Sequence, residues 1–122
     1  TAAKTDKRAL VASTLALTDA EAKKFWPIYD DYQRAREAAD RQKVRAIESV
    51  IATDKPVSDA FARDLAKDLT GADEAEVKAR RAMQNKLMRA LPAKKAFRYL
   101  QLESKLRAIQ AYDVAAAMPL IK

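Results

Sequence analysis

The chain has 122 residues, the length of a single domain (residues 1–122), and its 24 Lys and Arg outnumber 17 Asp and Glu to give a formal net charge of +7. Cysteine and histidine are both absent, which excludes disulfides, thiolate nucleophiles, imidazole bases and zinc sites built on these ligands. One glycine, four prolines and the lack of an apolar run of transmembrane length favour an almost entirely helical protein without a membrane span.

Two helices are expected in the first half of the chain, a short one over about 6–16 and a long one over about 18–52. Thr18 and Glu21 have the spacing of a capping box, and such a helix start is worth about 1 kcal/mol. Pro27 removes a backbone donor inside the long helix, so we expect either a kink there or a short helix followed by a long one. Apolar residues at three- and four-residue spacing predict one buried stripe, formed by Phe25, Tyr29, Tyr32, Ala35, Ala39, Ala46 and Val50.

The start of this long helix is dense in aromatic residues. It holds the only tryptophan, Trp26, beside Phe25, Tyr29 and Tyr32. We interpret this group as core filling, with the tyrosine hydroxyls and the indole N–H at the rim of the core. A ligand pocket or a clamp for a peptide is the alternative interpretation.

Two further helices are expected over about 58–91 and 92–118. Ser58 caps the third helix, and Gly71 in its middle costs up to about 1 kcal/mol relative to alanine, so we expect a local weakness or bend. Pro92 suits the first turn of the fourth helix. That helix is apolar over more than half its circumference, which predicts a central position in the bundle, against two neighbouring helices, or an oligomer interface. The stripe of the third helix is Phe61, Leu65, Leu69, Ala72, Ala79, Met83, Leu87 and Leu91.

Charge is distributed unevenly along the chain. No acidic residue occurs from Val77 to Leu102, although several precede this window. The helix macrodipole favours bases near a C-terminus, but it does not explain so many bases without counter-charges. Antiparallel packing of the second and third helices would join two basic groups into one cationic surface, serving solubility, anionic or unfolded partners, or nucleic acid. The groups are Lys78, Arg80, Arg81, Lys86, Arg89, Lys94, Lys95 and Arg98, and Arg34, Arg36, Arg41, Lys43 and Arg45.

Three short motifs resemble a known family. Leu17-Thr18-Asp19-Ala20-Glu21 is similar to the "LTxxQ" motif of the Spy/CpxP-like periplasmic helical proteins, with Glu21 in place of the glutamine. The segments 25–29 and 91–105 also resemble segments of relatives grouped with this superfamily. The second "LTxxQ" site is not kept, because Pro92 and Lys95 stand where threonine and glutamine are expected.

The resemblance implies an elongated helical hairpin with extra helices that pairs as an antiparallel dimer into a curved cradle. It also implies a periplasmic protein that acts as an ATP-independent chaperone or as a stress adaptor. No metal or cofactor is expected, because the chain has no histidine or cysteine ligands, which sets metal-responsive relatives aside. A start at Thr1 rather than at methionine suits a chain whose signal peptide has been removed, and a trimmed chain equally.

The expected function is therefore non-enzymatic binding of unfolded or partner proteins through a basic helical surface. A regulatory protein with one dedicated partner is the alternative, and a helical nucleic-acid-binding protein is less favoured because no recognition module is present. An enzyme is not expected, since no nucleophile–base pair or metal cluster can be assembled. We expect charged contacts from Arg80, Arg81, Lys86, Arg89, Lys94 and Arg98, and apolar contacts from Met83, Met88 and Leu87, the last also a core-stripe residue.

Overall fold

The computed structural model describes residues 2–53 and 55–121, and within them the chain forms four α-helices. They are α1 (Ala2–Leu15), α2 (Asp19–Ile51), α3 (Asp59–Ala90) and α4 (Ala93–Ala117). The predicted all-α class is confirmed. The first helix begins earlier than the expected start near residue 6, and the other three agree closely with the expected ranges.

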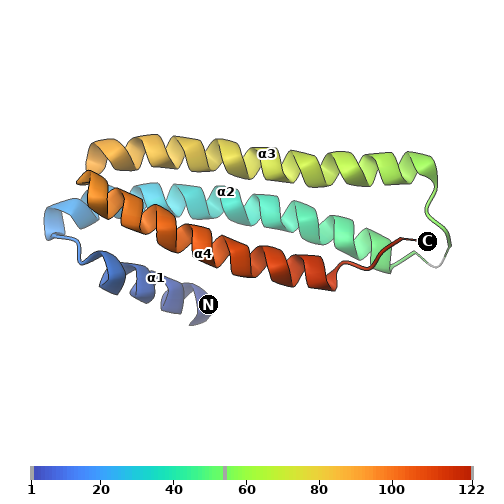
Figure 1. Cartoon of the computed structure of the whole chain (residues 1–122), viewed down its shortest axis with the longest axis horizontal. Coiled ribbons are helices and arrows are strands. Elements are labelled where there is room, and N and C mark those ends of the chain that lie inside the picture. The colour runs from blue at the N-terminus through green and yellow to red at the C-terminus, as the bar shows by residue number, and fades with distance from the viewer. Residues whose placement is uncertain (1, 54, 122) are drawn as a thin grey trace.

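The long helices α2 and α3 form an antiparallel hairpin, and α4 runs diagonally across one side of it (Figure 1). The shorter α1 lies beside α4. The ends of α1 and α3 and the starts of α2 and α4 meet at one end of the molecule, which we call the head end. The opposite end, where α2 turns into α3, is the tail end and consists mainly of these two helices.

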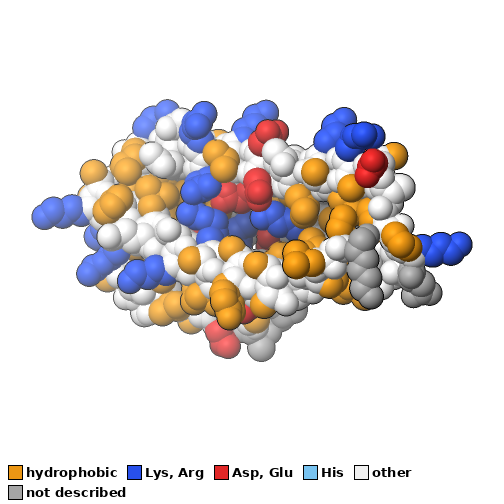
Figure 2. All heavy atoms as spheres, turned by 45° about the vertical axis from the view of Figure 1, so that its right-hand side comes forward, with side chains coloured by type: hydrophobic (Ala, Val, Ile, Leu, Met, Phe, Trp, Pro, Cys, Tyr) orange, Lys and Arg blue, Asp and Glu red, His pale blue; other side chains and the backbone are white. Residues whose placement is uncertain are grey.

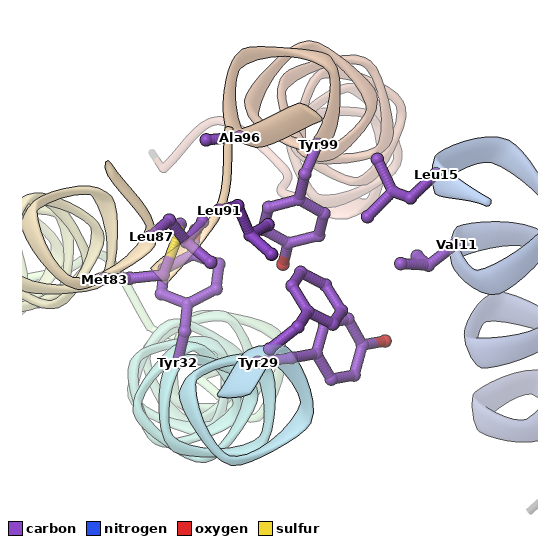
Figure 3. Close-up of a cluster of buried hydrophobic side chains, with 10 residues drawn as sticks. Val11, Leu15, Tyr29, Tyr32, Met83, Leu87, Leu91, Ala96 and Tyr99 are labelled. Atoms are coloured by element: carbon purple, nitrogen blue, oxygen red, sulfur yellow. The ribbon is translucent and has the colours of Figure 1, made fainter. Parts of the chain in front are cut away.

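The hydrophobic core occupies the head end, where all four helices contribute side chains (Figure 3). Its aromatic centre joins Phe25 and Tyr29 of α2 to Tyr99 of α4, and the Phe25 and Tyr99 rings meet edge to face at 5.1 Å. The interpretation of the aromatic group as core is confirmed for Phe25, Tyr29 and Tyr32, which are buried. The core residues are Val11, Leu15, Phe25, Tyr29, Tyr32, Met83, Leu87, Leu91, Ala96 and Tyr99.

The capping box at the start of α2 is present as predicted. The Glu21 amide donates to the Thr18 hydroxyl at 3.2 Å, and the Thr18 amide donates to Glu21 Oε1 at 2.9 Å. The helix then continues through Pro27 as one element, so the alternative of two separate helices is wrong. Phe25 and Tyr29 are buried on either side of the proline, and their packing opposes the cost of about 3 kcal/mol that a proline adds inside a helix.

Gly71 lies in an unbroken α3 at a point of close approach to α2. A Cβ atom added there would lie 3.4 Å from Gln42 Nε2. The same amide nitrogen donates to the Asp68 carbonyl oxygen at 2.7 Å, which ties the two helices together. The expected weakness at the glycine therefore coincides with an inter-helix contact.

The fourth helix packs against its neighbours through one narrow, partly polar face. It buries Ala96, Tyr99 and the charged Glu103, whereas Phe97, Ile109 and Tyr112 are more than half exposed. The expected packing against two neighbouring helices within one bundle is confirmed, because α4 contacts both α1 and α3. The oligomer-interface alternative stays a prediction. No helix in the described part of the chain is long and apolar enough to cross a membrane.

The hairpin register sets the basic group of α2 beside the acidic half of α3. Lys43 Nζ lies 2.6 Å from Asp73 Oδ1, and the Tyr32 hydroxyl donates to Glu76 Oε1 at 3.0 Å. The bases at 34–45 consequently run alongside the acids at 64–76, and the basic part of α3 lies further along, near the head end. The two basic groups meet only in part: Arg36, Lys43 and Arg80 line one groove, whereas the bases of α3 nearer the head end lie apart from those of α2.

Candidate functional site

Five exposed cations project from the last turns of α3 and the first turns of α4. Within residues 2–53 and 55–121, no acidic oxygen lies within 4.0 Å of any of their charged nitrogens. Figure 2 shows Lys and Arg side chains at this end of the molecule and along the outer edge of α3. We call these five residues the head cations: Arg81, Lys86, Arg89, Lys94 and Arg98.

The sixth predicted cation, Arg80, lies in a different environment. Its Nε is 3.3 Å from Glu76 Oε1, and the same oxygen is 3.5 Å from Arg107 Nε. The Tyr32 hydroxyl donates to this carboxylate as well. Arg80 is thus part of an internal cluster that joins α2, α3 and α4, and it is not a member of the free cationic surface.

Two of the three predicted apolar contact residues are in the core. Met83 is 3% exposed and Leu87 is fully buried, so neither is available to a partner in this structure. Their three- and four-residue spacing from Leu91 and Ala79 places them on the buried face of α3. Only Met88, which is 42% exposed, lies on the surface. The assignment of Met83 and Leu87 as contact residues is therefore corrected.

Phe97 is an exposed aromatic residue that sequence reasoning did not place in the site. It is 56% exposed and lies on α4 between two head cations, Lys94 and Arg98. Residues three and four positions apart share a helix face, so Lys94 neighbours both Phe97 and Arg98, which diverge from each other by about 100° on either side of it. Gln101 and Lys105 continue the line of Lys94 and Arg98 along α4. The available signal was an aromatic residue flanked by bases, but Phe97 was counted among the apolar positions that cover more than half the circumference of this helix.

A groove of about 630 Å³ separates α3 from the distal half of α4. Its walls carry small or apolar side chains, including Val77, Ala108 and Ala111, and its floor carries charged side chains of α2. Figure 2 shows these charged groups in the hollow between apolar side chains. In the described residues, Arg36 Nε and Glu76 Oε2 are buried there without a hydrogen-bond partner.

A second groove of about 970 Å³ lies on the other side of α4, between α1 and α2. Gln110 of α4 separates the two grooves, because it accepts from Arg36 Nη1 at 2.6 Å and donates to Asp40 Oδ2 at 2.6 Å. The distal half of α4 is therefore attached to α2 by polar contacts. Exposed bases of α2, including Arg41 and Arg45, line this second groove.

The molecule has one fully buried carboxylate, Glu103, among the described residues. Glu103 Oε1 lies 2.6 Å from Lys7 Nζ, and Oε2 accepts from Gln33 Nε2 at 3.2 Å and from the Tyr99 hydroxyl. Burial lowers the pKa of Lys7, against the favourable hydrogen bond to Glu103. Burial, with the Glu103 charge, raises the pKa of Tyr99. Every oxygen of this carboxylate has a donor, so the cluster is a closed polar contact between helices.

Comparison with known proteins finds no matching family model, no matching curated protein and no matching solved structure.

Proposed function

We propose that this chain is a non-enzymatic protein-binding protein that holds unfolded or partner proteins through the head cations, in the periplasm and without nucleotide. The observation that carries the proposal is a group of five exposed bases that have no acidic partner among the described residues, around the exposed side chains of Met88 and Phe97. Charges left unpaired at a surface raise the rate of encounter with anionic segments. Flexible or aromatic side chains then provide apolar contact with varied sequences.

The arrangement of the head cations favours a flexible partner over a rigid one. At about 100° per residue, Arg81 and Lys86 point about 140° apart around α3. Arg89 lies between these two directions. Such a distribution suits an unfolded segment that can wrap around the head end, and a nucleic-acid duplex would reach only part of it. The resemblance of the 17–21 and 91–105 segments to Spy/CpxP-like proteins supports the same class of function and the periplasmic location.

Light scattering from an aggregating, unfolded test protein provides the first experiment. We expect the chain at equal molarity and without ATP to suppress the scattering, and the suppression to weaken as salt screens the head cations. Absence of suppression at both low and high salt would contradict the chaperone proposal. It would favour the regulatory alternative, in which one dedicated partner is bound.

A triple charge reversal tests whether the head cations provide the surface. Replacing Arg81, Arg89 and Arg98 by glutamate should abolish suppression and leave helicity intact, because all three side chains are exposed. A matched control reverses three exposed bases elsewhere and changes the net charge equally. Full suppression by the head variant, or equal loss in both variants, would contradict the proposed surface. The control positions are Arg41, Arg45 and Arg63.

A further inference from the structure

The first helix, α1, packs on the rest of the molecule as a separate element, which we call the strap. Among the residues whose burial is described, it contributes only Val11 and Leu15 to the buried core. Its other contacts are polar: Arg8 Nη1 lies 2.7 Å from Asp30 Oδ1, and the Arg8 guanidinium lies 4.1 Å from the centre of the Trp26 ring. These contacts all join α1 to other helices. They can form equally well within one chain or between two copies.

The surface of α2 and α4 that receives α1, which we call the α1 seat, is selective for the helix it binds, because it contains a buried carboxylate. Glu103 is fully buried, and the only cation within 4.0 Å of it in the described residues is Lys7 of α1. Lys7 Nζ also donates to Gln33 Oε1 at 2.9 Å. A buried charge without its partner is costly, so a helix that replaces α1 must bring a base to the same place. A second copy of α1 brings Lys7 together with Val11 and Leu15 at the same spacing.

The hinge between α1 and α2 favours opening at one residue. The helices are joined by Ala16, Leu17 and Thr18, and Ala16 has a φ of 48°, a left-handed conformation that disfavours residues with a Cβ atom. The α2 side of the hinge is held firmly, since Lys95 Nζ donates to Glu21 Oε1 at 2.7 Å and to the Ala16 carbonyl oxygen at 3.2 Å. Extension at Ala16 relieves the unfavourable φ and moves α1 away as a unit.

We propose that two copies of this chain form a dimer by exchanging α1, so that the strap of each copy packs on α2 and α4 of the other. Each exchanged strap restores the Lys7–Glu103 pair and the buried positions of Val11 and Leu15. A strained short hinge is the element that commonly permits such exchange.

The head cations oppose this association, which gives the exchange a defined salt dependence. The hinge lies at the head end, where Lys95 contacts it beside Lys94 and Arg98. Exchange through this hinge therefore brings two positively charged head ends together. Salt screens that repulsion, whereas the exposed Arg8–Asp30 pair is present in the closed monomer and in the exchanged dimer alike and does not shift the balance between them. The dimer fraction is therefore expected to rise with ionic strength, opposite to the salt dependence of electrostatic partner binding.

Charge complementation tests the exchange directly. Lys7→Glu alone and Glu103→Lys alone each place like charges in the α1 seat, and each variant should be a monomer with a loosened strap. When the two variants are mixed, only an exchanged heterodimer contains two opposite-charge pairs. We expect the mixture to give a particle of about twice 13.6 kDa by multi-angle light scattering, with restored Trp26 fluorescence. A mixture that stays monomeric, or a dimer of either variant alone, would overturn the proposal.

The control pair is Lys43→Glu and Asp73→Lys, since α2 and α3 stay in the same copy during exchange and mixing should restore nothing. A second measurement uses the unmodified chain after refolding at high concentration. Here a dimer that increases with salt, and that decreases in Ala16→Gly, is expected because glycine removes the penalty of the closed hinge. A monomer at every concentration and salt level would contradict the exchange even if the charge variants fail to fold.

Discussion

At the scale of single residues, the most consequential side chain is Glu103. It is fully buried on the packing face of α4 and links Lys7, Gln33 and Tyr99. Buried ion pairs rarely add much net stability, but removal of one partner leaves the other without compensation. The polar cluster therefore specifies how α1 and α4 meet, and the aromatic core beside it provides most of the burial energy.

Glu103→Gln should lower the free energy of unfolding by about 3 kcal/mol, because Lys7 then keeps its charge in a mostly buried place without a counter-charge. Urea denaturation followed by Trp26 fluorescence measures the loss. Asp30→Asn is the matched control, since it breaks a pair whose side chains are 45% and 43% exposed. That control should cost less than about 1 kcal/mol. Equal effects of the two changes would contradict a special role for the buried pair.

Three buried tyrosines predict a loss of stability in alkali. Burial raises the pKa of Tyr29 and of Tyr32 to about 12, and it raises that of Tyr99 as well. Each phenol releases its proton more readily in the unfolded chain, so the contributions of Tyr29 and Tyr32 are intact below pH 10 and are lost between about pH 10 and 12, with a slope of up to about 1.4 kcal/mol per pH unit for each. Tyr99 adds a loss in the same direction that begins at the same pH. Lys7 acts in the opposite sense, because its pKa is lowered and its deprotonation favours the folded state.

Denaturant titrations at several alkaline pH values, with tyrosinate absorbance as a second readout, measure this slope. Tyr32→Phe removes one titrating group, and it should make the decline with pH shallower while lowering stability at neutral pH through the lost bond to Glu76. Stability that is constant from pH 10 to 12 would contradict the burial of these phenols.

At the scale of elements, Gly71 is a weak point in α3 that can be strengthened. Gly71→Ala should raise the free energy of unfolding by up to about 1 kcal/mol, the difference in helix propensity. The added Cβ meets only the end of the Gln42 side chain, at an ordinary contact distance of 3.4 Å. Thermal unfolding measures the gain, and Ala75→Gly at an exposed position of the same helix should give a loss of similar size. A destabilised alanine variant would show that Gln42 cannot adjust.

The elements themselves could be predicted from the sequence because their signals are local. Thr18 and Glu21 mark the start of α2, Ser58 marks that of α3, and the apolar spacing identifies most of the buried stripe. The candidate site was harder to predict, because exposure depends on which faces pack. Leu87 and Phe97 both satisfy a helical stripe, yet the first is buried and the second is exposed. The burial of Glu103 has no local signal, since it requires Lys7 from a distant helix.

At the scale of the whole molecule, packing density and charge are arranged along the same axis. The core and the head cations both lie at the head end, whereas the tail end joins α2 and α3 mainly through half-buried side chains such as Phe61, Leu65 and Val50. Between the two ends, the register of the hairpin places bases of α2 beside acids of α3. The pair of Lys43 and Asp73 is one example, and such pairing stabilises the middle of the hairpin. The surface proposed for partner binding therefore lies at the end of the protein that holds the hydrophobic core.

This arrangement predicts a gradient of local stability along the hairpin. Regions with few buried contacts open with lower free energies than the core. Amides of α2 and α3 beside Tyr29 and Leu87 should therefore exchange with solvent only on global unfolding, and those beside Val50 and Leu65 should exchange much earlier. Hydrogen exchange followed by mass spectrometry measures this difference, and Phe25→Ala should abolish it by removing core packing at the head end. Uniform protection along both helices would show that the hairpin, rather than the four-helix core, is the cooperative unit.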